Sequence, residues 1–446
     1  MSLRPPEKLQ KLQAALHAKA KASPKQRFHA LYDKVYRSDV MAHAYACCKA
    51  NGGAAGVDGL TFADIEQYGL DRWLGERAED LRVKAYRPSP VRRVWIPKPD
   101  GKQRPLGIPT IKDRVVQTAA LLVLEPIFEA DLQPEQYAYR ENRSALDAVN
   151  HVRDLLNSGY TQVVDADLSG YFDSIPHAEL MQCLARRIVD GAMLHLLKMW
   201  LEAPVEEIDE RGNKQRTTRN KDDGRGTPQG APISPLLSNL YMRRFVLGFK
   251  TLGHQARLNA RIVNYADDFV ICCRGTAKQA MTVMRNMMTA LKLTVNETKT
   301  HVRAVPAETF DFLGYTFGLH WAHRSQRMVL CGAPSKKRIL RVCDRISEIT
   351  DRKRSWLSET EMVTELNRVL GGWAGYFCLG PVSDAYRAIN AHVRYRFRQW
   401  WGAKHKTNKR KTRKFEPCWY WSPWLERTFG LLQLRWDPSR LLQAKA

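Results

Sequence analysis

The sequence predicts an α+β fold followed by a separate helical unit. Two apolar, β-rich runs, 160–166 and 261–273, carry carboxylates, and helical stretches at 178–188 and 192–201 lie between them. Strands interrupted by helices in this irregular order fit an α+β layer better than a repeating βαβ barrel. After Pro334 the apolar residues take up helical spacing, which indicates that a second structural unit begins there.

The N-terminal third of the chain is predicted to contain a helix, a loop, a hairpin and a second helix. Residues 9–22 read as a helix, and the glycine-rich stretch 51–59 reads as a loop. Residues 91–109 alternate as two short strands around Asp100-Gly101, which predicts a hairpin with a basic tip. An apolar helical run follows at 115–128, whereas the segment 206–225 is polar and charged.

The C-terminal part is predicted to be helical and then strongly basic. Ile339, Val342, Ile346 and Ile349 are spaced as one helix face, and a second helix follows around 366–370. Residues 392–414 contain many Lys and Arg but no Asp or Glu, and they are interleaved with Tyr395, Phe397, Trp400 and Trp401. This mixture favours contact with phosphates and stacking on bases, although a solvated tail remains an alternative.

Composition indicates a polyanionic partner. The chain has 446 residues, 71 Lys and Arg against 46 Asp and Glu, a net charge of +25 and a pI near 9.8. Such a charge attracts nucleic acid. The length of the chain suggests about two or three substructures. The sequence contains no run of about 20 apolar residues, which is the length needed to span a bilayer. We therefore expect no membrane partner.

Cysteine spacing and the N-terminus indicate a reducing compartment. The nine cysteines include adjacent pairs at 47–48 and 272–273 but no CxxC, which favours reduced thiols over zinc ligands. The basic N-terminus has no apolar segment of the kind found in secretory signals. We therefore expect a cytoplasmic protein.

Three carboxylates stand at the ends of predicted strands. Asp267 and Asp268 interrupt one apolar hairpin, and the strand 163–166 runs into Asp167. A hydrophilic turn is the alternative for the first pair, but like charges at neighbouring strand ends repel unless a cation lies between them. Two divalent ions about 3.5 to 4 Å apart can support nucleotidyl transfer in such a site, and oxygen ligands suit Mg²⁺. Asp165 competes with Asp167, because a period of two puts both on one strand face.

Several motifs resemble those of bacterial group II intron-encoded reverse transcriptases. Tyr-Ala-Asp-Asp at 265–268 resembles the reverse transcriptase signature, and Asp167 with Phe172 resembles the first catalytic block. Pro-Gln-Gly at 228–230 is similar to the block that lines the templating pocket, 96–109 to the fingers segment, and Phe-Leu-Gly-Tyr at 312–315 to the primer grip. The blocks follow the family order from about residue 28 to 376.

The resemblance implies a role for each motif. The family spacing selects Asp167 over Asp165, so Asp167, Asp267 and Asp268 would bind two Mg²⁺ ions. Phe172 would exclude ribonucleotides as a steric gate. The deoxynucleoside triphosphate would contact Lys98, Arg104, Phe172, Gln229 and Lys299. For Lys98 and Arg104 the alternative is that they lie at a solvated hairpin tip without binding a nucleotide. The primer grip would comprise Phe312, Leu313 and Gly314.

The resemblance also implies a right-hand polymerase with four regions. These are an N-terminal extension at 1–60, fingers and palm at 61–333, a helical thumb or maturase domain X at 334–390, and a basic DNA-binding region at 391–446. The last region would contact target DNA through Lys409, Arg410, Lys411, Arg413 and Lys414. Many relatives carry a further HNH nuclease with paired CxxC motifs. Cys418 stands alone here, so we expect no nuclease domain and no zinc.

The expected function is RNA-directed DNA synthesis, with a maturase activity that binds intron RNA and supports splicing and retrohoming. The partners would be intron RNA, an RNA template with its DNA primer, and a DNA target. A domesticated relative that serves DNA repair or phage defence is an alternative that the flanking DNA would decide. A splicing-only maturase is another, although such proteins often lose the Asp pair that is intact here.

Overall fold

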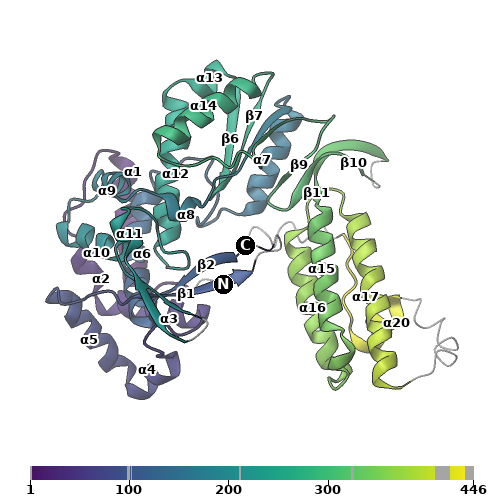
Figure 1. Ribbon diagram of the computed structural model, residues 1–446, viewed down its shortest axis with the longest axis horizontal. Coiled ribbons are helices and arrows are strands. Elements are labelled where there is room, and N and C mark those ends of the chain that lie inside the picture. Colours follow the sequence, from purple (N-terminus) through teal and green to yellow (C-terminus); the bar gives the residue numbers. More distant parts are fainter. Residues whose placement is uncertain are drawn as a thin grey trace. The chain divides into compact units, whose positions relative to one another are not determined.

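A computed structural model describes residues 3–97, 101, 103–209, 212–322, 326–406 and 422–436. Within these ranges the chain forms two compact units. The first contains residues 1–140, 166–256 and 282–300, and the second contains residues 141–165, 257–281 and 301–446. The fold is α+β with a helical C-terminal part, as the sequence predicts (Figure 1).

The first unit is mainly helical. Its helices are α1 (Glu7–Ala22), α2 (Tyr32–Val35), α3 (Ser38–Asn51), α4 (Phe62–Tyr68), α5 (Leu70–Arg82), α6 (Ile111–Glu129), α8 (Tyr171–Ser174), α9 (His177–Ala185), α10 (Gly191–Leu201), α11 (Arg219–Asp222) and α12 (Ser234–Thr251). Two further helices, α13 (His254–Arg257) and α14 (Ala277–Ala290), span the points where the chain passes between units. The predicted helices at 9–22 and 115–128 are confirmed as α1 and α6.

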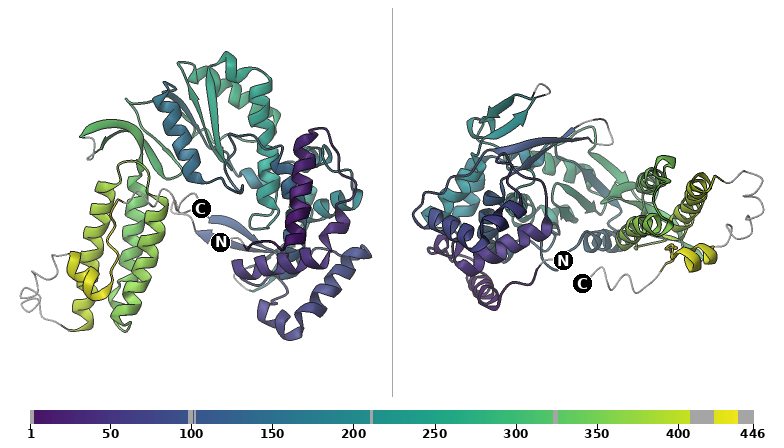
Figure 2. Two further views of the ribbon diagram at one scale, coloured as in Figure 1. Left: turned by 180° about the vertical axis from the view of Figure 1, so that it is seen from behind. Right: turned by 90° about the horizontal axis from the view of Figure 1, so that it is seen from below.

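Helix α6 is the central element of the first unit. Thr110 caps its N-terminus by accepting from the Asp113 amide, and most of its apolar residues are buried. Helices α1, α2, α3 and α12 all pack against it. The side chain of Gln13 in α1 donates to the carbonyl of Leu122 at 3.0 Å, which joins the N-terminal helix to this core. Figure 2 (left) shows α1 as the dark purple helix among the helices of this unit.

One sheet belongs to the first unit, with the order β2-β1-β4-β5. The predicted hairpin is confirmed as β1 (Val91–Pro97) and β2 (Gln103–Ile108), which pair antiparallel. The polar, charged segment 206–225 contains most of β4 (Val205–Ile208), together with β5 (Lys214–Thr217) and α11. Because every residue of β5 is exposed, this strand has no apolar side that its sequence could reveal.

The second unit contains two sheets. The order β6-β7-β3-β8 joins β6 (Ala260–Tyr265), β7 (Asp268–Cys273), β3 (Gln162–Ala166) and β8 (His301–Ala304). The order β11-β10-β9 joins β9 (Phe310–Phe312), β10 (Tyr315–Ala322) and β11 (Arg327–Pro334). Helix α7 (Ala145–Asn157) packs against β6, β7 and β11, and so connects the two sheets.

A helical bundle completes the second unit. It consists of α15 (Lys336–Ile349), the short helix η1 (Arg352–Arg354), α16 (Glu359–Tyr376), α17 (Ser383–Lys404) and α20 (Ser422–Phe429). Figure 1 shows α15, α16 and α17 side by side. Leu431 and Leu434 also enter the bundle core. No helix in the described ranges is both long and apolar enough to cross a membrane.

The bundle corrects two expectations for the C-terminal region. Helix α17 continues without a break through position 390, so the expected domain boundary falls inside a helix. Phe397 and Trp400 were expected to be free for base stacking, but both are fully buried in the bundle core. The physical reason is the helical period, which turns Val393, Phe397 and Trp400 to one face. Tyr395 lies on the other side and is 60% exposed.

This difference in burial predicts unequal effects on stability. Phe397→Ala should lower the free energy of unfolding of the bundle by about 3 to 5 kcal/mol, because it removes a fully buried ring. Tyr395→Ala, the matched control on the same helix, should change it by less than about 0.5 kcal/mol. Urea denaturation followed by circular dichroism measures both. Equal losses would show that Phe397 does not belong to a packed core.

Candidate nucleotidyl-transfer site

The turn that contains Asp267 and Asp268 is held by its own backbone and by a buried asparagine. Tyr265 pairs with Asp268 across the β6–β7 hairpin, so Ala266 and Asp267 form a two-residue turn. Ala266 has a φ of 56°, which is uncommon for a residue with a side chain. The fully buried side-chain amide of Asn264 donates to the Ala266 carbonyl at 2.8 Å and stabilises this conformation. Asp267 is half-buried and Asp268 is exposed.

Asp167 follows β3 directly and is bound by a second segment of the first unit. Its Oδ2 accepts from the Asn296 side-chain amide at 2.9 Å and lies 3.3 Å from Lys299 Nζ. Its carbonyl accepts from the Asn296 backbone amide at 2.8 Å, and its own amide donates to Thr300 Oγ1 at 3.3 Å. The carboxylate is therefore oriented by Asn296 and neutralised by Lys299.

Lys299 was expected near the pyrophosphate, and the structure places its ammonium group beside Asp167. Its side chain is 62% exposed, so the ammonium group contacts both solvent and the carboxylate. Asn296 is a residue that sequence reasoning missed. The only signal available was its place three residues before Lys299 in a segment already of interest.

The loop 227–230 connects three of the predicted nucleotide-binding residues. Gln229 Oε1 accepts from Arg104 Nε at 3.1 Å, and Gln229 Nε2 donates to Asp173 at 2.9 Å. The buried Thr227 donates through its backbone amide to the Phe172 carbonyl at 2.7 Å. Phe172 itself is 7% exposed. The structure thus brings Arg104, Phe172 and Gln229 to one loop, while Lys98 lies outside the described residues.

Two glycines allow strand β2 to approach this loop. The Gly107 amide donates to the Gln229 carbonyl at 2.6 Å. A Cβ at Gly230, where φ is 105°, would lie 2.5 Å from the Gly107 carbonyl oxygen, which is shorter than any allowed contact. Only glycine fits this position, so the hairpin β1–β2 and the loop are fixed to each other.

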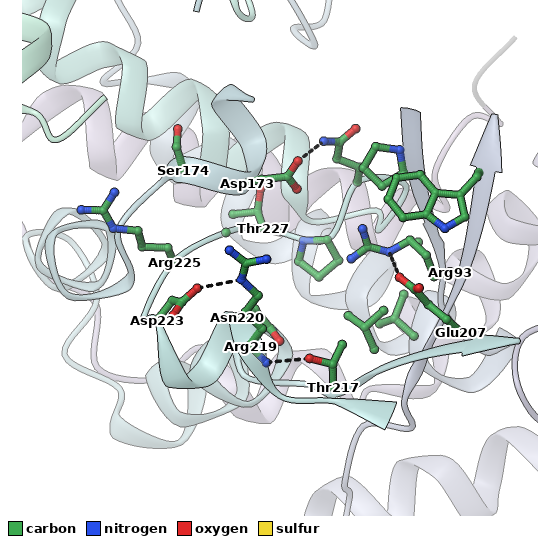
Figure 3. Close-up of a pocket in the computed structure, with 18 residues that line it drawn as sticks. Arg93, Asp173, Ser174, Glu207, Thr217, Arg219, Asn220, Asp223, Arg225 and Thr227 are labelled. Carbon is green, nitrogen blue, oxygen red and sulfur yellow. Dashed lines mark hydrogen bonds and ion pairs between the residues drawn. The ribbon is translucent and has the colours of Figure 1, made fainter. Parts of the chain in front are cut away.

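A cavity of about 730 Å³ lies on one side of this loop (Figure 3). Its walls come from β1, β2, β4, β5, α8, α11 and residues 225–229. Arg93 pairs with Glu207 at 3.9 Å and Arg219 with Asp223 at 3.1 Å, so acidic and basic side chains alternate around it. Asp173, which binds Gln229, also lines the cavity. Asp173 therefore links the cavity to the loop.

The expected primer grip lies in the second unit. Phe312 ends β9 and is buried, and Leu313 and Gly314 form the turn to β10. The five basic residues from Lys409 to Lys414 that were expected to contact DNA lie outside the described residues.

No three His, Cys, Asp or Glu side chains within the described ranges are grouped as metal ligands. The donor set nevertheless fits a hard cation, because Asp167, Asp267 and Asp268 offer only carboxylate oxygens. The Lys299 ammonium beside Asp167 also shows that positive charge is accommodated at this carboxylate.

Comparison with known proteins identifies the family. Residues 96–317 match the model described as reverse transcriptase (RNA-dependent DNA polymerase), and residues 339–419 match the group II intron maturase-specific domain. Protein YkfC of Escherichia coli (strain K12) is 31% identical over 366 residues, which cover 74% of this chain and 93% of YkfC.

Two further relatives are named for introns. The group II intron-encoded protein LtrA of Lactococcus lactis subsp. cremoris is 31% identical over 227 residues, which cover 50% of this chain and 36% of LtrA. Nuclear intron maturase 2 of Arabidopsis thaliana is 32% identical over 111 residues, which cover 25% of this chain and 15% of that protein. The chain thus matches only about a third of LtrA but nearly all of YkfC. It belongs to the family of group II intron-encoded reverse transcriptases and maturases.

Proposed function

We propose that this chain synthesises DNA on an RNA template with two Mg²⁺ ions held by Asp167, Asp267 and Asp268. The observation that carries the proposal is the strand order in the second unit. Strand β7, which begins at Asp268, is the neighbour of β3, which leads into Asp167. When bound, the ions would activate the primer 3′-hydroxyl and stabilise the leaving pyrophosphate.

The chain's own residues would orient and balance these carboxylates. Asn296 holds the Asp167 side chain in one rotamer through a 2.9 Å hydrogen bond. Lys299 compensates the charge of Asp167, and its exposed ammonium is free to turn toward phosphate oxygens when a cation replaces it. The pyrophosphate role expected for Lys299 is therefore compatible with its place beside Asp167.

The nucleotide would bind against the loop 227–230. Arg104 offers a guanidinium for phosphate oxygens, Gln229 holds that guanidinium in place, and Lys98 would add a second cation. The hydrogen bond from the Thr227 amide to the Phe172 carbonyl holds the backbone of Phe172 against the loop, and its ring is buried. A fixed ring under the sugar would exclude a 2′-hydroxyl, so the product would be DNA.

The helical bundle would serve as the maturase part. Residues 339–419 match the maturase-specific domain, and LtrA is named as an intron-encoded protein. Because the chain has a net charge of +25, it would bind intron RNA and target DNA as its partners. Reading the DNA on both sides of the gene for a group II intron would test the intron role directly.

The metal site predicts a loss of polymerisation without a loss of RNA binding. Asp167→Asn and Asp267→Asn should each reduce primer extension on an RNA template by more than 1000-fold, because a neutral amide binds Mg²⁺ weakly. Asp165→Asn is the matched control and should retain activity within about tenfold, or about 1.4 kcal/mol of barrier. Activity of Asp167→Asn within tenfold of the parent would contradict the site.

The buried ring predicts sugar selectivity. Phe172→Val should admit ribonucleotides that the parent rejects, because it opens the space under the sugar. The measurement is the ratio of kcat/KM values for one deoxynucleotide and its ribonucleotide, in parent and variant. Parent enzyme that uses both equally well would show that Phe172 is no gate. Phe62→Leu, which changes a partly buried ring that packs on Tyr45, controls for general loosening.

The basic segment predicts salt-dependent DNA binding. Replacing Lys409, Arg410, Lys411, Arg413 and Lys414 by Ala should weaken duplex binding and flatten its dependence on salt, which has a log-log slope of about 0.9 per neutralised phosphate. Titrations at several salt concentrations measure this slope. Primer extension on a short preannealed template should survive. An unchanged slope with unchanged affinity would exclude these residues as DNA contacts.

A further inference from the structure

The turn between β9 and β10 is bound by the last residues of helix α16. Tyr376 donates its hydroxyl to the Leu313 carbonyl at 2.8 Å. Tyr315, which follows the turn, donates its hydroxyl to the Tyr376 carbonyl at 2.6 Å. Two tyrosines from segments about 60 residues apart in sequence therefore exchange hydrogen bonds around one turn. Tyr315 is fully buried and Tyr376 is half-buried.

The turn itself has a backbone that its sequence does not favour. Leu313 has a φ of 50° and Gly314 a φ of 84°, with Phe312 and Tyr315 paired on either side. Two positive φ values mark a type I′ hairpin turn, whose first position normally holds Asn, Asp or Gly. Leucine is strained there, because its Cβ crowds the following carbonyl. Contacts from outside the hairpin must therefore hold Leu313 in place.

Further contacts from the bundle close over the turn. The Ser335 amide donates to the Gly314 carbonyl at 3.0 Å. A Cβ at Gly314 would lie 3.0 Å from Arg338 Nε and 3.3 Å from the ring of Phe377. Arg338 belongs to α15, and Phe377 follows α16 directly. The turn is thus enclosed by both helices.

Tyr376 also lies within electrostatic reach of the Tyr265–Asp268 turn, in the same unit. Burial, together with the nearby Tyr265 and Asp268, raises the pKa of Tyr376 to about 12, although Arg338 opposes the rise. The hydroxyl therefore keeps its proton at any pH used for polymerisation. It therefore remains a hydrogen-bond donor to the Leu313 carbonyl.

We propose that Tyr376 is a positioning residue for the primer, holding the Leu313 carbonyl and with it the turn that grips the primer 3′ end. The proposal rests on the proposed function, in which Phe312, Leu313 and Gly314 form the primer grip. Tyr376 lies within residues 339–419, which match the maturase-specific domain. A residue of the maturase part would thereby set the geometry of DNA synthesis.

The test compares three single hydroxyl deletions in the full chain. Tyr376→Phe removes the donor to Leu313, and Tyr315→Phe removes the reciprocal bond. Tyr386→Phe is the matched control, because its buried hydroxyl donates to the Phe377 carbonyl at 2.9 Å and not to the turn. Steady-state primer extension measures KM for the primer-template and KM for the nucleotide, and thermal melting measures stability.

Tyr376→Phe should raise KM for the primer-template about fivefold to tenfold, as the loss of one neutral hydrogen bond implies, and leave KM for the nucleotide unchanged. Tyr315→Phe should shift the same constant in the same direction. Tyr386→Phe should leave it within about twofold of the parent, even if all three variants melt at lower temperature.

An unchanged KM for the primer-template in Tyr376→Phe would overturn the proposal, as would an equal rise in Tyr386→Phe, which would reveal a purely structural effect. Failure of the proposed function is separable from these results. In that case the parent would extend no primer, or the Asp167→Asn variant would extend it as well as the parent.

Discussion

Each carboxylate of the candidate site stands at the end of a strand whose other residues are mostly buried. Burial of β3, β6 and β7 supplies the free energy that holds these strand ends in place against the repulsion of like charges. At Asp167 the charge is balanced by Lys299 and the side chain is oriented by Asn296, whereas Asn264 stabilises the backbone of the turn before Asp267. Every other feature of the site acts on this arrangement of charge.

The loop 227–230 shows how backbone contacts, rather than side-chain length, set the nucleotide side of the site. Gly107 and Gly230 permit two chain segments to approach closely, and Gln229 then bridges Arg104 and Asp173. The bridge connects a predicted phosphate-binding residue to the wall of the 730 Å³ cavity.

The C-terminal bundle packs around one core and also contacts the turn after β9. Its interior depends on α15, α16 and α17 together with Leu431 and Leu434, so the bundle continues past the end that sequence reasoning assigned. Tyr376, the last residue of α16, donates a hydrogen bond to Leu313 in the turn after β9. Hydrogen bonds in the second unit therefore join residues of the segment that matches the reverse transcriptase model to Tyr376 of the segment that matches the maturase-specific domain.

The amino-acid sequence by itself determined the α+β class, the two main helices of the first unit, the hairpin 91–108 and the three candidate carboxylates, because strand and helix periods and short motifs are local. It could not reveal strand β5, whose residues are all exposed, or the burial of Phe397 and Trp400, which helix packing decided. Only the tertiary structure brought Asn296 to Asp167 and Tyr376 to Leu313, which are separated by 129 and 63 residues. Such pairs leave no local pattern, since their contact depends on how distant segments pack.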